Sequence, residues 1–141
     1  MNRYLLDTNI VSELVKPSPS EALIVWFGDQ PDDALFISSF AIAEIAKGIL
    51  LLPNGRKRRE LEAWFQGSTG PAALFAGRVL DFDTAAAMAW ARLMSEGQRQ
   101  GRSRSPLDMI VAATAEAHGC QIVTANERHF AGLDVFNPMR G

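Results

Sequence analysis

The sequence contains a single cysteine, Cys120, so no disulfide can form within the chain. This favours a protein of a reducing compartment. No apolar run approaches the ~20 residues that are needed to span a membrane, and the N-terminal residues do not show the pattern of a signal peptide. A glycine-rich phosphate-binding loop is also absent. We therefore expect a soluble, cytoplasmic protein with no membrane association.

Neither sign of charge dominates, since 14 basic and 16 acidic side chains give a net charge of −2. That sum does not indicate a nucleic-acid-binding protein, but the basic residues are unevenly distributed. They gather at 56–59 and again at Arg99, Arg102 and Arg104. If several acids surround a cation, the remaining surface is more positive than the net charge suggests. The charge balance therefore neither supports nor excludes a nucleic-acid partner.

The length of 141 residues is that of one domain, and we treat 1–141 as a single unit. Short continuous apolar runs are typical of strands buried on both faces, and helical patterns lie between them. The predicted strands are 4–6, 35–37, 79–80, 121–123 and 135–136. The predicted helices are 10–15, 21–27 (stopped at Gly28), 38–52, 56–65, 84–98 and 106–118. This alternation predicts an α/β fold with a mainly parallel sheet of about five short strands between helices.

The predicted order of strands and helices indicates a candidate site that contains three acids. Asp7 stands where the first strand ends, Glu44 in the second turn of the helix after the second strand, and Asp108 in the first turn of the helix before the fourth. Asn126 follows that fourth strand. Because the carboxyl ends of parallel strands face the amino ends of the helices, these side chains are expected at one edge of the sheet. Carboxylates gathered there suit a hard divalent cation, and the helix amino ends suit phosphate oxygens.

Each acid also has a purely structural explanation. Asp7 could cap the next helix, and Asp108 completes a variant capping box that begins at Ser105. Glu44 could form a surface ion pair with Lys47. However, the helix that carries Glu44 is apolar nearly all round, which implies burial, and a buried carboxylate is costly without a cation. Capping alone does not explain why all three acids converge on one edge.

Several segments together resemble one family, the PIN-domain ribonucleases, and in particular the VapC/FitB-like toxins of bacterial toxin–antitoxin pairs. The likeness spans nearly the whole chain. It rests on 6–14 (Leu-Asp-Thr-Asn-Ile-Val-Ser-Glu-Leu), Ser38-Ser39, Ala43-Glu44-Ile45 with Gly48, 52–58, Pro106-Leu107-Asp108 with 110–115, Val123-Thr124-Ala125-Asn126, and Asn137-Pro138. The acidic motifs are short and weak singly, but in this order they are specific.

The resemblance implies a parallel-sheet fold, dependence on Mg²⁺ or Mn²⁺, and Asp7, Glu44 and Asp108 as the acidic site. Where the family often has further acids, this chain has Asn126 and His129. Asn126 could still supply a neutral oxygen. The resemblance also implies an RNA substrate, a homodimer, a cognate antitoxin protein, and contact with operator DNA only indirectly, through that antitoxin.

The corresponding mechanistic hypothesis is hydrolysis of RNA phosphodiester bonds. Asp7 and Asp108 would bind one Mg²⁺ directly, and Glu44 would act through water or take up a proton. Thr8 and Thr124 are candidate hydrogen-bond donors to the carboxylates. Attack by water predicts products with 5′-phosphate and 3′-hydroxyl ends. The three arginines Arg99, Arg102 and Arg104 are predicted to form a mobile rim that contacts the RNA backbone.

Two alternatives remain open at this point. The chain could be a catalytically weak or inactive PIN-fold module that binds a partner or nucleic acid. It could also be a phosphatase with Asp7 as a nucleophile, although that chemistry needs a second acid where Asn9 stands. A partner surface is expected because 25–27 (Val-Trp-Phe) and Trp64-Phe65 carry more aromatic surface than one core face can bury.

Overall fold

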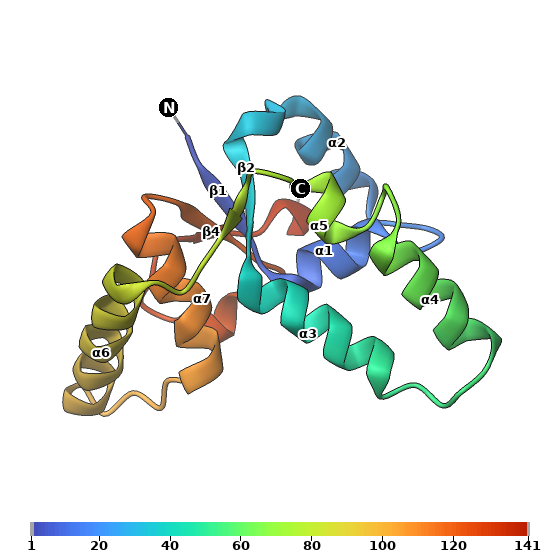
Figure 1. Cartoon of the computed structure of the whole chain (residues 1–141). Helices are drawn as coiled ribbons and strands as arrows, with labels where there is room; N and C mark the ends of the chain where they lie inside the picture. The colour runs from blue at the N-terminus through green and yellow to red at the C-terminus, as the bar shows by residue number, and fades with distance from the viewer. Residues whose placement is uncertain (1, 141) are drawn as a thin grey trace.

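The computed structural model describes residues 2–140 and contains one parallel sheet of five strands in the order β3-β2-β1-β4-β5 (Figure 1). The strands are β1 (Tyr4–Leu6), β2 (Leu35–Ser38), β3 (Val79–Leu80), β4 (Gln121–Val123) and β5 (Val135–Phe136). All four neighbouring pairs are parallel. The predicted strands and the predicted α/β class are therefore confirmed, with β2 one residue longer than expected.

Residues 2–140 also form seven α-helices and three 3₁₀ helices. The α-helices are α1 (Thr8–Leu14), α2 (Glu21–Asp29), α3 (Ser39–Leu50), α4 (Arg56–Gln66), α5 (Pro71–Leu74), α6 (Thr84–Arg99) and α7 (Pro106–Ala117). The 3₁₀ helices are η1 (Asp32–Ala34), η2 (Glu127–Phe130) and η3 (Pro138–Arg140). The six predicted helices are present, but α5 and the 3₁₀ helices were not predicted. The predicted stop at Gly28 is wrong, because α2 continues through it to Asp29.

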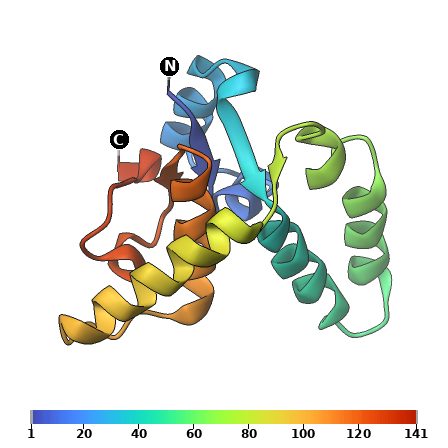
Figure 2. The same ribbon diagram turned by 60° about the vertical axis from the view of Figure 1, so that its left-hand side comes forward.

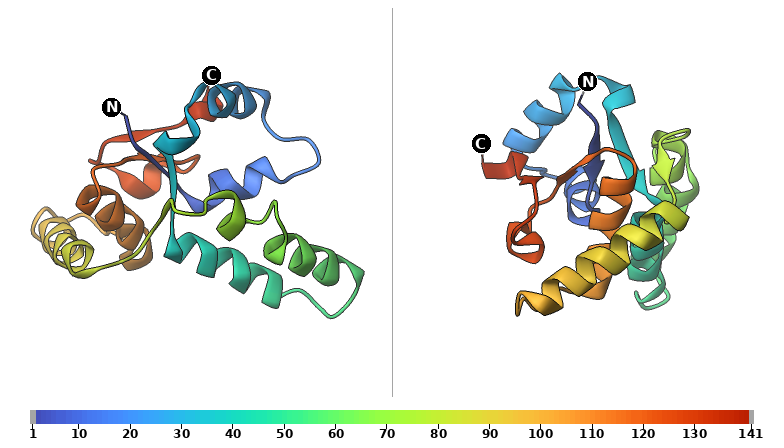
Figure 3. Two further views of the ribbon diagram at one scale, coloured as in Figure 1. Left: turned by 45° about the horizontal axis from the view of Figure 1, so that its top comes forward. Right: turned by 90° about the vertical axis from the view of Figure 1, so that its left-hand side faces the viewer.

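Alternation along the central strands divides the interior into two apolar clusters, one on each face of the sheet. Leu5 of β1 packs in the cluster with residues of α6 and α7. The next residue, Leu6, packs on the opposite face with residues of α1, α2 and α3. Successive side chains of a strand point to opposite faces, so β1 contributes to the core on both faces of the sheet. The result is three layers, with α6 and α7 on one side of the sheet (Figure 3).

The order of the strands places a change of direction at the centre of the sheet. The chain proceeds from β1 outward to β2 and β3, and then returns to β4 on the other side of β1 (Figure 2). In such sheets, ligands bind outside the carboxyl ends of the strands at this reversal. Asp7 directly follows β1, and Thr124 directly follows β4. Both residues therefore lie at the position where this topology favours a site.

The helix α3 is less buried than its composition suggested, so that prediction is wrong. Only Ala41, Ile45 and Ile49 are buried on it, whereas Leu50 is 61% exposed and Leu51, just beyond the helix, is 74% exposed. The reason is visible in Figure 1, where α3 and α4 form a hairpin that extends away from the sheet. Only one side of α3 can then pack on the core.

None of the helices within residues 2–140 has both the length and the apolar character needed to cross a membrane.

Candidate active site

Asp7 is the most enclosed acid at the carboxyl edge of the sheet, with 8% of its surface exposed. Its carboxylate accepts a hydrogen bond from the Thr8 backbone N–H (2.9 Å), which caps α1 as expected. The other carboxylate oxygen accepts from Asn9 Nδ2 (3.0 Å) and from Thr124 Oγ1 (3.0 Å). Asp7 can therefore cap α1 and also belong to a site, because Oδ1 accepts the capping bond and Oδ2 accepts the bonds from Asn9 and Thr124.

The environment of Asp7 disfavours its negative charge. Burial is the largest cause and raises the pKa of the carboxyl above its ordinary value. The hydrogen bonds from Thr124 and Thr8 oppose this shift, whereas the nearby charges of Glu44 and Asp108 add to it. A neighbouring cation would reverse the balance, because it stabilises the ionised form.

Glu44 is tied to the same place through Thr8. The Thr8 hydroxyl donates to Glu44 Oε1 at 2.5 Å, while the Thr8 backbone N–H binds Asp7. Glu44 itself is half-buried on α3. Among residues 2–140 it makes no ion pair with Lys47, so the simple surface pair is not formed. Thr8 thus positions two acids that are far apart in the sequence.

Asp108 opens α7 and is partly exposed. Its backbone N–H donates to the Ser105 side chain (3.3 Å), which caps the helix. The side chain is directed elsewhere: Oδ2 lies 3.5 Å from His129 Nδ1, and 29% of the side chain is exposed. The cap therefore depends on the serine, and the carboxylate of Asp108 remains available at the edge of the sheet.

Asn9 joins the site, and sequence reasoning did not assign it a role there. Its Nδ2 donates to Asp7 and also lies 3.3 Å from Thr124 Oγ1, while its Oδ1 accepts from the Ala125 backbone N–H (3.0 Å). It thereby connects the end of β1 to the end of β4. The only signal in the sequence was its place two residues after Asp7. Asn126 also lies at this edge, but its side chain is exposed and its backbone N–H donates to Thr124.

We predict that Asn9→Ala lowers the free energy of unfolding by roughly 1–3 kcal/mol, because it removes one of the two side-chain donors to Asp7 Oδ2 and leaves the Ala125 backbone N–H without its partner. The matched control is Asn126→Ala, since the Asn126 carboxamide makes no hydrogen bond within residues 2–140. We expect the control to change stability by less than about 0.5 kcal/mol. Denaturant unfolding of both variants provides the comparison. Equal losses would show that Asn9 does not tie the two strand ends together.

The acids have the chemistry of a site for a hard divalent cation. Within residues 2–140, no three Asp, Glu, His or Cys side chains stand close enough to form a closed ligand group. Mg²⁺ does not require one, because it commonly keeps several waters and uses one or two carboxylates. Asp7 and Asp108 could bind such an ion directly, and Glu44 could do so through water. All of these donors are oxygens, as Mg²⁺ and Mn²⁺ prefer.

Two of the three arginines that were predicted to form an RNA-binding rim bind backbone carbonyls of the chain. Arg104 lies back across α6 beside Gly97: its Nη1 donates to the Leu93 carbonyl (2.5 Å), and its buried Nε has no partner within residues 2–140. Arg102 donates to the Ala131 carbonyl (3.1 Å). Both anchor the loop before α7 instead of leaving it free. Of the three, Arg99 is exposed at the end of α6.

Comparison with known proteins agrees with this fold. The PIN domain family model matches residues 4–135. The VapC ribonuclease Y4jK of Sinorhizobium fredii is 38% identical over 136 residues, which are 95% of this chain and 96% of that protein. The toxin FitB of Neisseria gonorrhoeae is 35% identical over the same shares of the two chains. The crystal structure of FitAcB from Neisseria gonorrhoeae superimposes with a TM-score of 0.85, at 34% identity, and covers 96% of this chain and 97% of that one.

Proposed function

Because the chain belongs to the PIN domain family, we propose that it is a Mg²⁺-dependent endoribonuclease that acts as the toxin of a toxin–antitoxin pair. One observation carries the chemical part of this proposal. The enclosed carboxylate of Asp7 lies at the reversal of a parallel sheet, and the charges of Glu44 and Asp108 are close enough to raise its pKa. The ribonuclease and toxin names of two relatives support the class.

Mg²⁺, or Mn²⁺ in its place, would be held by Asp7 and Asp108, with Glu44 acting through water. When bound, such an ion offsets phosphate charge and increases the acidity of water, which makes a nucleophile available near neutral pH. The chain's own groups fix the geometry for this chemistry. Thr124 and Asn9 hold the Asp7 carboxylate from one side, and Thr8 holds it from the other.

Glu44 is assigned the task of orienting the attacking water or accepting its proton. Its half-buried position and the bond from the Thr8 hydroxyl support this role, because both limit its rotamers. Asn126 supplies a neutral oxygen or amide group at the same edge. Because water attacks, and not the 2′-hydroxyl of RNA, the products carry 5′-phosphate and 3′-hydroxyl ends.

A simple titration tests metal binding without any RNA. We predict that Mg²⁺ raises the unfolding free energy of the wild-type chain, by about 2.7 kcal/mol when its concentration is roughly a hundred times the Kd. Asp108→Asn should lose most of this gain. The control is Asp134→Asn at the opposite edge of the sheet, where the new amide oxygen can still accept from Gln121. If neither Mg²⁺ nor Mn²⁺ changes the unfolding free energy of the wild-type chain, the alternative of an inactive binding module is favoured.

The α3–α4 hairpin offers the surface for a protein partner. A groove between the two helices is lined by Ala46, Ile49, Leu50, Glu62, Phe65 and Gln66. The expectation about the aromatic residues is corrected for Trp26, which packs between Tyr4 and Phe136, and for Trp64, which packs against the core. Phe65 packs against the core and also lines the groove. Exposed apolar surface comes from aliphatic residues, among them Val25 of the predicted segment (63% exposed) and Leu50.

We assign the α3–α4 groove to an apolar helix of the cognate antitoxin. A basic side chain of that partner could then reach the acidic site, since α3 also carries Glu44. Contact with operator DNA would come only through the antitoxin. The chain would act in the cytoplasm as a homodimer, with RNA as its substrate.

A further inference from the structure

A polar hollow lies beside the acidic site, and of its wall residues only Asn126 has a role in the mechanism above. It is enclosed by residues 125–129, which lead from β4 into η2, and by Asn137 and Arg140 near the end of the chain. Its volume is about 200 Å³. It borders the acids directly, because His129 belongs to its wall and lies 3.5 Å from Asp108.

The side chains of the hollow leave donors without partners inside the protein. Arg128 is exposed and forms no ion pair or hydrogen bond within residues 2–140. The Asn126 carboxamide is also unbonded over that range. The only acid of the wall, Glu127, pairs with Arg140 Nε at 2.7 Å and accepts a long bond (3.4 Å) from Asn137. The wall therefore carries one cation without an acidic partner, and its free groups are an arginine fork and an amide.

The size and charge of the hollow indicate the chemical class of its ligand. Sites for whole small molecules commonly enclose about 300–1,000 Å³, so this volume suits one phosphate group better than a whole nucleotide. A guanidinium fork matches two phosphate oxygens, and an amide can donate to a third. Arg102 and Arg104 cannot take this part without leaving the carbonyls that they bind.

We propose that this hollow binds a backbone phosphate of the RNA next to the cleaved bond, with Arg128 as its main contact. The inference rests on the proposed ribonuclease function and specifies where the substrate strand passes. A phosphate held here lies on the His129 side of Asp108, so the strand crosses the site from the sheet edge toward η2. The contact is to the RNA backbone and therefore does not depend on base identity.

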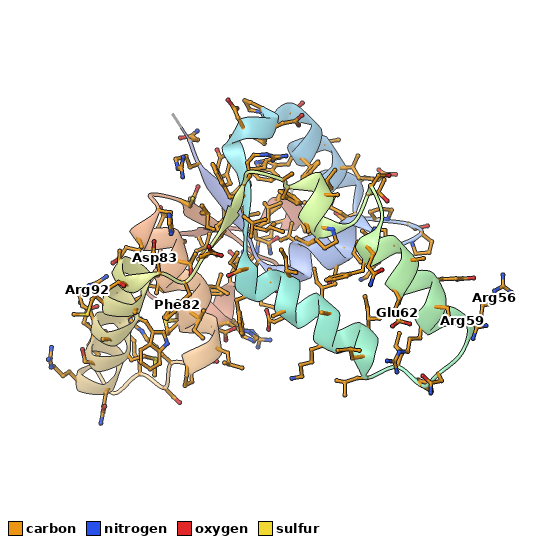
Figure 4. All side chains as sticks on the ribbon, viewed as in Figure 1. Arg56, Arg59, Glu62, Phe82, Asp83 and Arg92 are labelled. Atoms are coloured by element: carbon orange, nitrogen blue, oxygen red, sulfur yellow. The ribbon has the colours of Figure 1, made fainter. Side chains whose placement is uncertain are left out.

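The test compares Arg128→Gln with Arg59→Gln, which removes the same charge from an exposed residue of α4 that forms no ion pair within residues 2–140. Arg59 lies far from the acidic edge, toward the tip of the hairpin (Figure 4). The probe is a fluorescently labelled, random-sequence single-stranded RNA, and binding is measured over a range of salt concentrations in the absence of divalent ions. We expect Arg128→Gln to weaken binding roughly tenfold and to reduce the salt slope by about 1. Arg128→Lys should recover most of the affinity, because a point charge still attracts phosphate.

Equal effects of Arg128→Gln and Arg59→Gln, or no effect of the former, would overturn the proposal. Cleavage of the same RNA in Mg²⁺ separates this failure from that of the proposed function. If the wild-type chain cleaves RNA and Arg128→Gln has an unchanged KM, only the phosphate site is wrong. If the wild-type chain neither binds nor cleaves RNA, the proposed function fails and the phosphate site fails with it.

Discussion

Asp7→Asn and Asp108→Asn are each expected to reduce RNA cleavage by more than about a hundredfold, because loss of even an outer partner of a metal ligand costs about 10–100-fold. Each substitution removes a carboxylate that would hold the cation. Asp108→Asn also removes one of the charges that raise the pKa of Asp7, and Asp7→Asn removes the Asp7 carboxylate itself. The fold should persist, since Asp108 is partly exposed and α7 is capped by Ser105.

The stability of Asp7→Asn provides a second measurement that does not require RNA. Since burial raises the pKa of Asp7 in the folded chain, the folded state binds the proton more tightly than the unfolded state. As pH falls through the folded pKa toward the ordinary value, wild-type stability should therefore rise relative to that of the Asn variant. Below the ordinary value the difference becomes constant. Unfolding measured in EDTA over this range checks the sign.

The decisive control for both substitutions is Asp134→Asn, which changes one acid at the opposite edge of the sheet and should keep full activity. Wild-type cleavage by purified Asp7→Asn or Asp108→Asn would contradict the assignment of the metal site. A variant that loses cleavage but has also lost cooperative unfolding is replaced by the other variant, because Asp7 is enclosed and Asp108 is not.

The product of the reading frame adjacent to this gene is expected to form a stable complex with the chain and to abolish its RNA cleavage. The physical reason is the α3–α4 groove, whose apolar wall includes Leu50 and Phe65. Light scattering should show a homodimer alone and a larger assembly with the added protein. If the chain is a stable monomer that does not bind this protein and cleaves RNA equally well in its presence, the prediction is wrong and the chain is a nuclease without this partner.

A matched pair of substitutions locates the partner surface. Leu50→Asp places a charge in the groove and should weaken the complex at least about tenfold, because an unpaired charge is costly in an apolar interface. Met88→Asp is the control: Met88 is 68% exposed on α6, on the opposite face of the sheet from α3. Both variants should retain cleavage. If Met88→Asp weakens the complex and Leu50→Asp does not, the partner binds on α6.

The sheet could be predicted from the sequence because parallel strands that are buried on both faces are short continuous apolar runs. Successive side chains of such a strand pack on opposite faces of the sheet. Leu5 and Leu6 illustrate this, since each fills a different core. The burial of α3 could not be predicted in the same way. Its apolar residues are distributed all round the helix, but α3 packs against the sheet along one side only. Composition does not reveal that α3 and α4 extend from the domain as a hairpin. The short helix α5 gives too few residues for any periodic signal.

The candidate site, too, could be predicted from the sequence only in part. The topology rule placed Asp7 and Asn126 at one edge of the sheet, and Thr124 was a candidate donor to the carboxylates; the structure shows Thr124 donating to Asp7. The role of Asn9 could not be predicted, because its bond to Ala125 joins segments more than a hundred residues apart. The direction of Arg104 depends on the absence of a side chain at Gly97, two residues before the end of α6. Side-chain direction is set by such local contacts, which a list of basic residues does not contain.

The most direct measurement is cleavage of RNA by the purified chain with and without Mg²⁺, followed by identification of the newly formed ends. Hydrolysis at the edge formed by Asp7, Glu44 and Asp108 predicts cleavage only when a divalent ion is present, with 5′-phosphate and 3′-hydroxyl ends. Cleavage that persists in EDTA, or that leaves 2′,3′-cyclic phosphate ends, would contradict it.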